Sequence, residues 1–323
     1  MNIASDSAYF FKIKCEKGDG EMERVQINHN VDYSRIIQGF WRTKDWQKST
    51  QELNRFIHEL VELGVTTMDH ADIYGDYSCE ALFGKALALS PELREKIQLI
   101  SKCGIILPTD RLELFDGHRY DLSKSHIVGA VDRSLKALGT DYLDTLLLHR
   151  PSPLMNPDEV RTALDILVEQ GKIKSFGVSN FSNTQYDLLN SDIKSHKLHI
   201  AVNQLQVSPY HAEPMYDGTI DHMYQDGVKI MGWSPLAGGK LLNLNDDKAK
   251  RVMSIISPIA YKNNVAPTSV VTAWLAKHPA TIMPIMGTGQ IEHMQDAVKG
   301  LEIELSDQEW FDIYVAVLGQ DIP

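Results

Sequence analysis

The sequence predicts a closed (β/α)8 barrel, the TIM-barrel architecture of the α/β class, and three observations favour this fold. Short apolar runs of strand length recur along the chain and alternate with longer amphipathic stretches of helical period. The chain has 323 residues, which exceeds the roughly 250 that such a barrel needs. The first run is followed by WRTKDW and not by a G-x-G-x-x-G phosphate turn, which argues against an open doubly wound sheet.

Eight runs are candidates for the barrel strands. They are short, apolar and β-branched, and stretches with the period of a helix separate most of them. In chain order we expect strands over residues 35–40, 66–72, 97–104, 142–150, 173–180, 200–206, 228–234 and 281–287.

Amphipathic helices are expected between these strands. In residues 49–64 an apolar stripe faces the sheet and Gly64 ends the helix; the stripe is formed by Leu53, Phe56, Ile57, Leu60 and Leu63. Residues 123–139 repeat the arrangement with Gly139 as the carboxyl-terminal cap, and their buried face is Ile127, Val131, Leu135 and Leu138. A terminal helix is expected from about Ser306.

The chain is expected to form a single domain over residues 1–323, because no low-complexity run or Pro/Gly-rich linker marks a second boundary. Residues 1–34 form an extension, in which Gly18-Asp19-Gly20 predicts a hairpin turn and residues 25–27 its second arm. Residues 35–323 hold the barrel and the terminal helix.

Composition and charge exclude several classes of protein. With a formal net charge of −11, the chain lacks the excess of basic residues that binds nucleic acid phosphates. The charged amino-terminal segment is not a secretory signal, and no apolar stretch reaches the roughly 18 residues of a membrane span. Cys15, Cys79 and Cys103 form no CxxC pair, which favours a reducing compartment. We therefore expect a cytoplasmic protein without nucleic acid or membrane partners, with a monomer as the default.

Polar side chains follow the predicted strands at their carboxyl ends, where barrel active sites lie. Asp69 and Tyr74 follow the second strand, Lys102 the third and His149 the fourth. An ammonium favours phenolate, so Lys102, held by Asp69, is expected to lower the pKa of Tyr74. A carbonyl oxygen that gains charge as hydride arrives needs a proton donor and a second polar group, roles open to Tyr74 and His149. The four residues therefore indicate carbonyl reduction.

Purely structural roles are also open to polar residues at the strand ends. Asp69 and Lys102 alone could be a structural ion pair. Ser179 and Asn180, at the end of the fifth predicted strand, could cap a helix. His70-x-Asp72 is part of a metal-site pattern, but no HExxH or cysteine cluster supplies further ligands, so no metal is expected.

These residues stand in motifs through which the chain resembles the aldo-keto reductase superfamily from about Arg35 onward. Asp69-His-Ala-Asp-Ile-Tyr74-Gly75 is similar to the family's D-x-A-x-x-Y-G motif. The other similar segments are Ser101-Lys102, Leu148-His149-Arg150-Pro151, GVSNF at 177–181, VNQ at 202–204 and WSPL at 233–236. Within the superfamily the chain most resembles the YdhF-type bacterial oxidoreductases.

The resemblance implies an NADP-dependent reductase of aldehydes or ketones, with Tyr74 as general acid supported by Asp69, Lys102 and His149. It implies that Ser179, Asn180 and Gln204 hold the nicotinamide carboxamide and that Trp233 stacks on the ring. The other cofactor contacts that it implies are Gly39, Phe40, Trp41, Asp69, Ser234, Leu236, Gly238, Lys240, Gly287, Thr288, Gln290 and His293.

The chain departs from the family pattern among the residues implied to bind the adenosine end of the cofactor. Met286, His293 and Ala297 stand where many relatives carry proline, arginine and asparagine. Neutral histidine binds a 2′-phosphate less well than arginine, so NADPH is expected with a modest preference over NADH.

Two other functions stay open beside the reductase. One is a cofactor-sensing regulatory protein that resembles potassium-channel β subunits, and the other is a phosphate-binding barrel of unrelated chemistry. The substrate is not indicated, because the loop at 104–122 shows no clear preference. Its Arg111, Arg119 and Tyr120 either meet an anionic substrate or are solvated.

Overall fold

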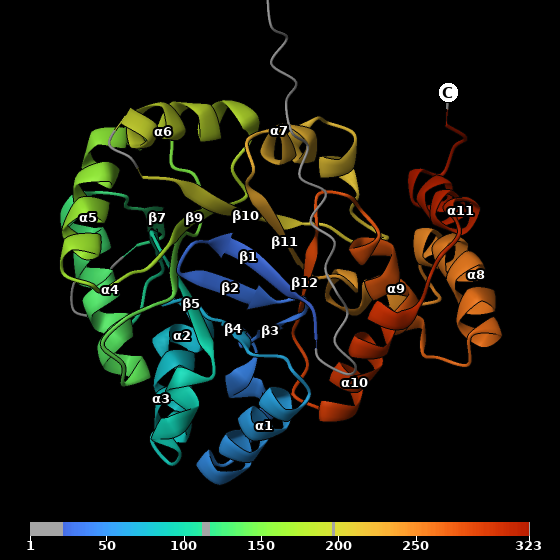
Figure 1. Cartoon of the computed structure of the whole chain (residues 1–323), viewed down its shortest axis with the longest axis horizontal. Coiled ribbons are helices and arrows are strands. Elements are labelled where there is room, and N and C mark those ends of the chain that lie inside the picture. The colour runs from blue at the N-terminus through green and yellow to red at the C-terminus, as the bar shows by residue number, and fades with distance from the viewer. Residues whose placement is uncertain (1–21, 112–116, 196–197, 323) are drawn as a thin grey trace, which may run out of the picture.

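The computed structural model describes residues 22–111, 117–195 and 198–322, in which eight parallel strands close into a barrel (Figure 1). The turn expected at Gly18-Asp19-Gly20 lies outside these residues. Neighbouring strands run β3, β4, β5, β8, β9, β10, β11 and β12 around the ring, and β12 pairs with β3 to close it. All eight predicted strands are confirmed, with bounds Ile37–Gly39, Thr67–Asp69, Gln98–Cys103, Thr145–Leu148, Phe176–Ser179, Ile200–Gln206, Lys229–Trp233 and Met283–Met286 in that order.

Helices surround the barrel on its outside (Figure 1). The described helices are α1 (Thr50–Glu62), α2 (Tyr74–Tyr77), α3 (Cys79–Leu87), α4 (Lys124–Leu138), α5 (Pro157–Glu169), α6 (Asn183–Ser195), α7 (Thr219–Gln225), α8 (Asp247–Lys262), α9 (Pro267–Ala276), α10 (Ile291–Lys299) and α11 (Asp307–Leu318). In the described parts of the chain, none of them has both the length and the apolar character that crossing a membrane requires.

Local sequence signals account for the ends of the predicted helices. Ser49 and Glu52 form a capping box at the start of α1, and each accepts a backbone N–H that the first turn leaves unpaired. Gly139 ends α4 in the left-handed conformation with φ of 68°. The predicted apolar stripes face the barrel, and of their members only Leu63 and the cap positions are not fully buried.

A hairpin of the described residues closes the amino-terminal end of the barrel. Residues 25–27 belong to its first arm, β1 (Arg24–Asn28), which pairs with β2 (Val31–Ser34). Tyr33 bonds Thr145 and Arg24 bonds Gln98, the first residues of β8 and β5. Four apolar side chains of the hairpin pack onto the residues inside the barrel: Val25, Ile27, Val31 and Tyr33. Residues 25–27 thus form a strand, and burial against the barrel explains the register of the described hairpin.

Candidate active site

A buried ion pair connects the ends of β4 and β5 and reaches the first residue of α2. The Lys102 ammonium donates hydrogen bonds to Asp69 Oδ2 at 2.8 Å, to the His70 carbonyl at 2.7 Å and to the Tyr74 hydroxyl at 2.9 Å. An ammonium has three protons, so these contacts use all of them. The Lys102 side chain is 0% exposed, which requires such pairing because an unpaired buried charge is costly.

The turn after β4 sets the position of Tyr74. Its N–H donates to the Ala71 carbonyl, and Gly75, Asp76 and Tyr77 then take left-handed backbone angles with φ of 57° to 59°. A side chain at position 75 would place its Cβ 2.5 Å from Cys79 Sγ, so glycine is required there. This tight turn fixes the phenol over Lys102.

His149 follows β8 and completes the group. Its ring centroid lies 5.8 Å from that of Tyr74, and the planes meet at 78°. Burial, followed by the Lys102 and Arg150 charges, holds the pKa of His149 well below its ordinary value. The imidazole is therefore neutral at pH 7 and can exchange a hydrogen bond with an oxygen in the cavity.

The pKa of Tyr74 corrects one expectation. Burial raises it more than the Lys102 ammonium lowers it, so the phenol pKa lies above its ordinary value in the free protein. Burial also opposes the charge of Lys102, but Asp69 and Tyr74 outweigh that effect and raise the pKa of Lys102. The net lowering expected for Tyr74 is wrong, since desolvation was left out of it. The phenol therefore keeps its proton at neutral pH, and the Lys102 ammonium, 2.9 Å from the hydroxyl, would stabilise a phenolate there.

These directions predict the pH dependence of any reaction in which Tyr74 donates its proton. The protonated phenol is present below its pKa and is lost as pH rises through it, and the raised value places that loss above about pH 10. We expect kcat/KM for carbonyl reduction to be level between about pH 6 and pH 9, measured in a buffer series of constant ionic strength. If kcat/KM showed an apparent pKa inside that interval that does not come from ionisation of the substrate, Tyr74 would not be the proton donor.

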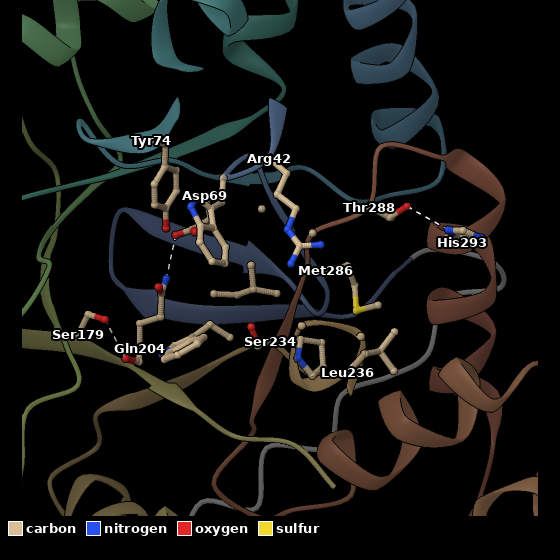
Figure 2. Close-up of a pocket in the computed structure, with 18 of the residues that line it drawn as sticks. Arg42, Asp69, Tyr74, Ser179, Gln204, Ser234, Leu236, Met286, Thr288 and His293 are labelled. Carbon is tan, nitrogen blue, oxygen red and sulfur yellow. Dashed lines mark hydrogen bonds between the residues drawn. The ribbon is translucent and has the colours of Figure 1, made fainter. Parts of the chain in front are cut away.

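A chain of polar side chains continues from the ion pair along the neighbouring strands. Gln204 Nε2 donates to Asp69 Oδ1 at 2.8 Å, and Ser179 Oγ donates to the Gln204 carbonyl at 3.0 Å. Asn180 Nδ2 donates to Ser179 Oγ at 2.7 Å, and Trp233 Nε1 donates to Asn180 Oδ1 at 3.0 Å. Figure 2 shows part of this series of hydrogen bonds. It joins the ends of β9, β10 and β11 to the carboxylate of β4.

These side chains border a cavity of about 530 Å³ at the carboxyl ends of the strands. Figure 2 shows Tyr74 and Asp69 on one side of it, Thr288 and His293 on the other, and Arg42 between them. The predicted residues that line it are Gly39, Trp41, Asp69, Tyr74, His149, Ser179, Asn180, Gln204, Trp233, Ser234, Leu236, Gly238, Gly287, Thr288 and His293. Lys102 lies just behind Tyr74.

Three predicted cofactor residues do not line this cavity. Phe40 is fully buried and stacks on His70 with 4.7 Å between ring centroids. Lys240 and Gln290 are exposed outside the cavity. The alternation of side chains explains Phe40, since Gly39 and Trp41 on either side of it face the opening.

His70 belongs to the core and not to a metal site. Its ring lies between Phe40 and Phe83, and burial lowers its pKa to about 3. Over the residues that the structure covers, no group of three His, Cys, Asp or Glu side chains could hold a metal ion. Cys103 is buried among apolar residues outside the barrel, as its place next to Lys102 predicts.

Two arginines that were not among the predicted site residues also line the cavity. Arg42 follows Trp41 after β3, and Arg150 follows His149 after β8. Across the described ranges neither guanidinium forms an ion pair with a carboxylate. Their adjacency to predicted site residues was a usable signal, but a cation after a strand is most often solvated.

Comparisons with known proteins find relatives over most of the chain. The model of the Aldo/keto reductase family matches residues 35–315. The oxidoreductase YdhF of Escherichia coli is 44% identical over 94% of this chain and 100% of its own length. A 6-dehydroglucose reductase of Agrobacterium fabrum is 36% identical over 93% of this chain and 100% of its own. The solved structure of a thermostable aldo-keto reductase, Tm1743, with the inhibitor epalrestat has a TM-score of 0.73 and 25% identity, and covers 91% of this chain and all of that one.

Proposed function

The chain belongs to the aldo/keto reductase family, and we propose that it reduces an aldehyde or ketone to an alcohol with hydride from NADPH, with Tyr74 as the general acid. The observation that carries the proposal is the hydroxyl of Tyr74, which borders the cavity while the buried Lys102–Asp69 pair holds it from behind. A purely structural role of the Lys102–Asp69 pair would not explain why a tyrosine hydroxyl borders the cavity next to it.

The residues divide the proton chemistry among themselves. The cofactor, when bound, supplies the hydride that reaches the carbonyl carbon. The Tyr74 hydroxyl donates a hydrogen bond to the carbonyl oxygen and gives up its proton as the alkoxide forms. Neutral His149 borders the same space and orients that oxygen. The charge of Lys102, which Asp69 maintains, stabilises the phenolate that remains.

The cavity wall fits a nicotinamide cofactor. Ser179, Asn180 and Gln204 offer donors and acceptors for a carboxamide, and Trp233 offers an aromatic face for the ring. Further along the cavity, a Cβ built on Gly239 or Gly287 meets nothing within 4 Å. The backbone there is open to a large group such as a diphosphate.

Arg42 would hold the diphosphate. A Cβ built on Gly238 comes within 3.9 Å of an Arg42 guanidinium nitrogen, so the cation faces the open glycine segment. We expect Arg42→Gln to weaken NADPH and NADH by a similar factor of about tenfold, because both carry the same diphosphate. Titration of tryptophan fluorescence with each cofactor measures this. A loss confined to NADPH would instead place Arg42 at the 2′-phosphate.

The adenosine end favours NADPH only modestly. His293 is exposed and its Nδ1 lies 3.2 Å from Thr288 Oγ1 (Figure 2). An imidazole and a hydroxyl can bond a phosphate, but neither carries the permanent charge of arginine. NADPH is therefore the proposed cofactor, and NADH is expected to serve less well.

The experiment that tests the proposed function is the oxidation of NADPH, followed at 340 nm, with a panel of aldehydes and ketones. We expect oxidation that depends on both the carbonyl compound and the enzyme. Cofactor binding without oxidation by any member of the panel would point to a cofactor-sensing protein. No binding of either cofactor would contradict the nicotinamide site itself.

A further inference from the structure

Cationic side chains outnumber anionic ones around the cavity, although the chain as a whole carries −11. Among the described residues that line it, Asp69 is the one acidic residue, and Lys102 already balances its charge. Arg42 and Arg150 also line it, and within the described segments neither has a carboxylate partner. Arg42 faces the glycine segment proposed for the diphosphate. Arg150 is therefore the cation that the cofactor leaves without a partner.

Arg150 lies at the reacting end of the cavity. It follows His149 directly, and its guanidinium carbon is 5.7 Å from the centroid of the Trp233 ring, which the proposed function assigns to the nicotinamide. Arg150 is also close enough to His149 to affect it electrostatically. Burial lowers the pKa of His149 most, and the charges of Lys102 and Arg150 lower it further. A substrate whose carbonyl oxygen meets Tyr74 and His149 thus has Arg150 next to it.

We propose that Arg150 binds a carboxylate on the substrate, so that the enzyme acts on aldehydes or ketones that carry an acid group. The inference rests on the proposed function for the chemistry of the carbonyl end. A guanidinium binds a carboxylate through two parallel hydrogen bonds, and a single cation balances a single negative charge. Arg150 lies within cation–π range of Trp233, so its charge is close to the place proposed for the nicotinamide.

The reaction balances without a further reactant. A C–H bond forms at the carbonyl carbon from the hydride of NADPH, which is oxidised to NADP⁺. An O–H bond forms with the proton of Tyr74, and solvent returns that proton to the phenolate. The substrate carboxylate stays unchanged throughout, so Arg150 acts in binding and orientation.

The test compares two probes that differ in one charge, 4-carboxybenzaldehyde and its methyl ester. We expect wild-type kcat/KM to favour the acid by about tenfold or more, as a charge-assisted hydrogen bond provides. In Arg150→Gln the preference should vanish through a higher KM for the acid, and any change in kcat should be the same for acid and ester. Arg150→Lys keeps the charge and should restore part of the preference.

Arg111→Gln is the matched control. Arg111 is an exposed cation that pairs with Asp76 at 2.9 Å and does not line the cavity. Its loss should leave the ratio of acid to ester unchanged. A ratio that collapses in Arg111→Gln and survives in Arg150→Gln would overturn the inference, as would equal or better use of the ester, or of a neutral sugar aldehyde, by the wild type.

A binding measurement separates this inference from the proposed function. The product-like acid 4-(hydroxymethyl)benzoate is titrated into the protein with NADP⁺ present, with 4-methylbenzyl alcohol as the neutral comparison, and tryptophan fluorescence is followed. We expect the acid to bind about tenfold tighter than the neutral alcohol, and only when Arg150 is present. If neither aldehyde is reduced, the proposed function fails, and this titration still decides whether Arg150 binds a carboxylate. No difference between the two ligands overturns the inference.

Discussion

Replacing Tyr74 by phenylalanine is expected to lower kcat for aldehyde reduction by about a hundredfold or more, the contribution typical of a general acid. The substitution removes the hydroxyl that lies 2.9 Å from Lys102 Nζ and leaves the ring in place. Because that ring also packs against His149, the cavity keeps its shape. Steady-state kinetics with 4-nitrobenzaldehyde and NADPH measure the loss.

Cofactor binding provides the control for this variant. None of the residues assigned to the carboxamide bonds the Tyr74 hydroxyl in the described structure, so the dissociation constant for NADPH should stay close to the wild-type value. Tyr77→Phe removes a hydroxyl from the same turn that bonds the Leu107 N–H and does not border the cavity. A Tyr74→Phe enzyme that turns over as fast as Tyr77→Phe refutes the general-acid role.

Replacing Lys102 by methionine is expected to affect both stability and activity. The change leaves the Asp69 carboxylate, which is 4% exposed, without its cation. Breaking a buried pair by removing one partner costs about 3–5 kcal/mol of the free energy of unfolding. Turnover should fall at least as far as in Tyr74→Phe, since the phenolate loses its stabilising charge. Denaturant unfolding and NADPH oxidation measure the two effects separately.

An exposed ion pair offers the comparison for Lys102. Lys262 pairs with Glu309 at 3.0 Å, and its side chain is 70% exposed. Lys262→Met should change the free energy of unfolding by less than about 1 kcal/mol and leave turnover as it is, because solvent screens such pairs. Equal destabilisation by both substitutions would mean that the Lys102 pair contributes no more than a surface contact.

The barrel could be predicted because its signals are local. Most strands are apolar runs followed by a polar residue, and two of the predicted helices end at a glycine, Gly64 and Gly139. Asp69, Lys102 and His149 could be brought together for the same reason, since the carboxyl ends of parallel strands meet at one mouth. Nothing more than strand order was needed to place them.

Other features depend on contacts between distant segments, which local patterns do not contain. The register of the hairpin follows from the packing of Val25 and Tyr33 onto the barrel interior, not from a glycine turn. The pKa of Tyr74 depends on how deeply it is buried, which no neighbour in the sequence reveals. Arg42 and Arg150 gain their significance from having no acidic partner in the folded chain as described.

A crystal structure with NADP⁺ bound tests the central claim most directly, because it shows where the phenol lies relative to the carbon that carries the hydride. We expect the nicotinamide ring on Trp233 and its carboxamide among Ser179, Asn180 and Gln204. The Tyr74 hydroxyl, still held by Lys102, should face C4 of the ring. A hydroxyl turned away from C4, or separated from the Lys102 ammonium once the cofactor is bound, would contradict it.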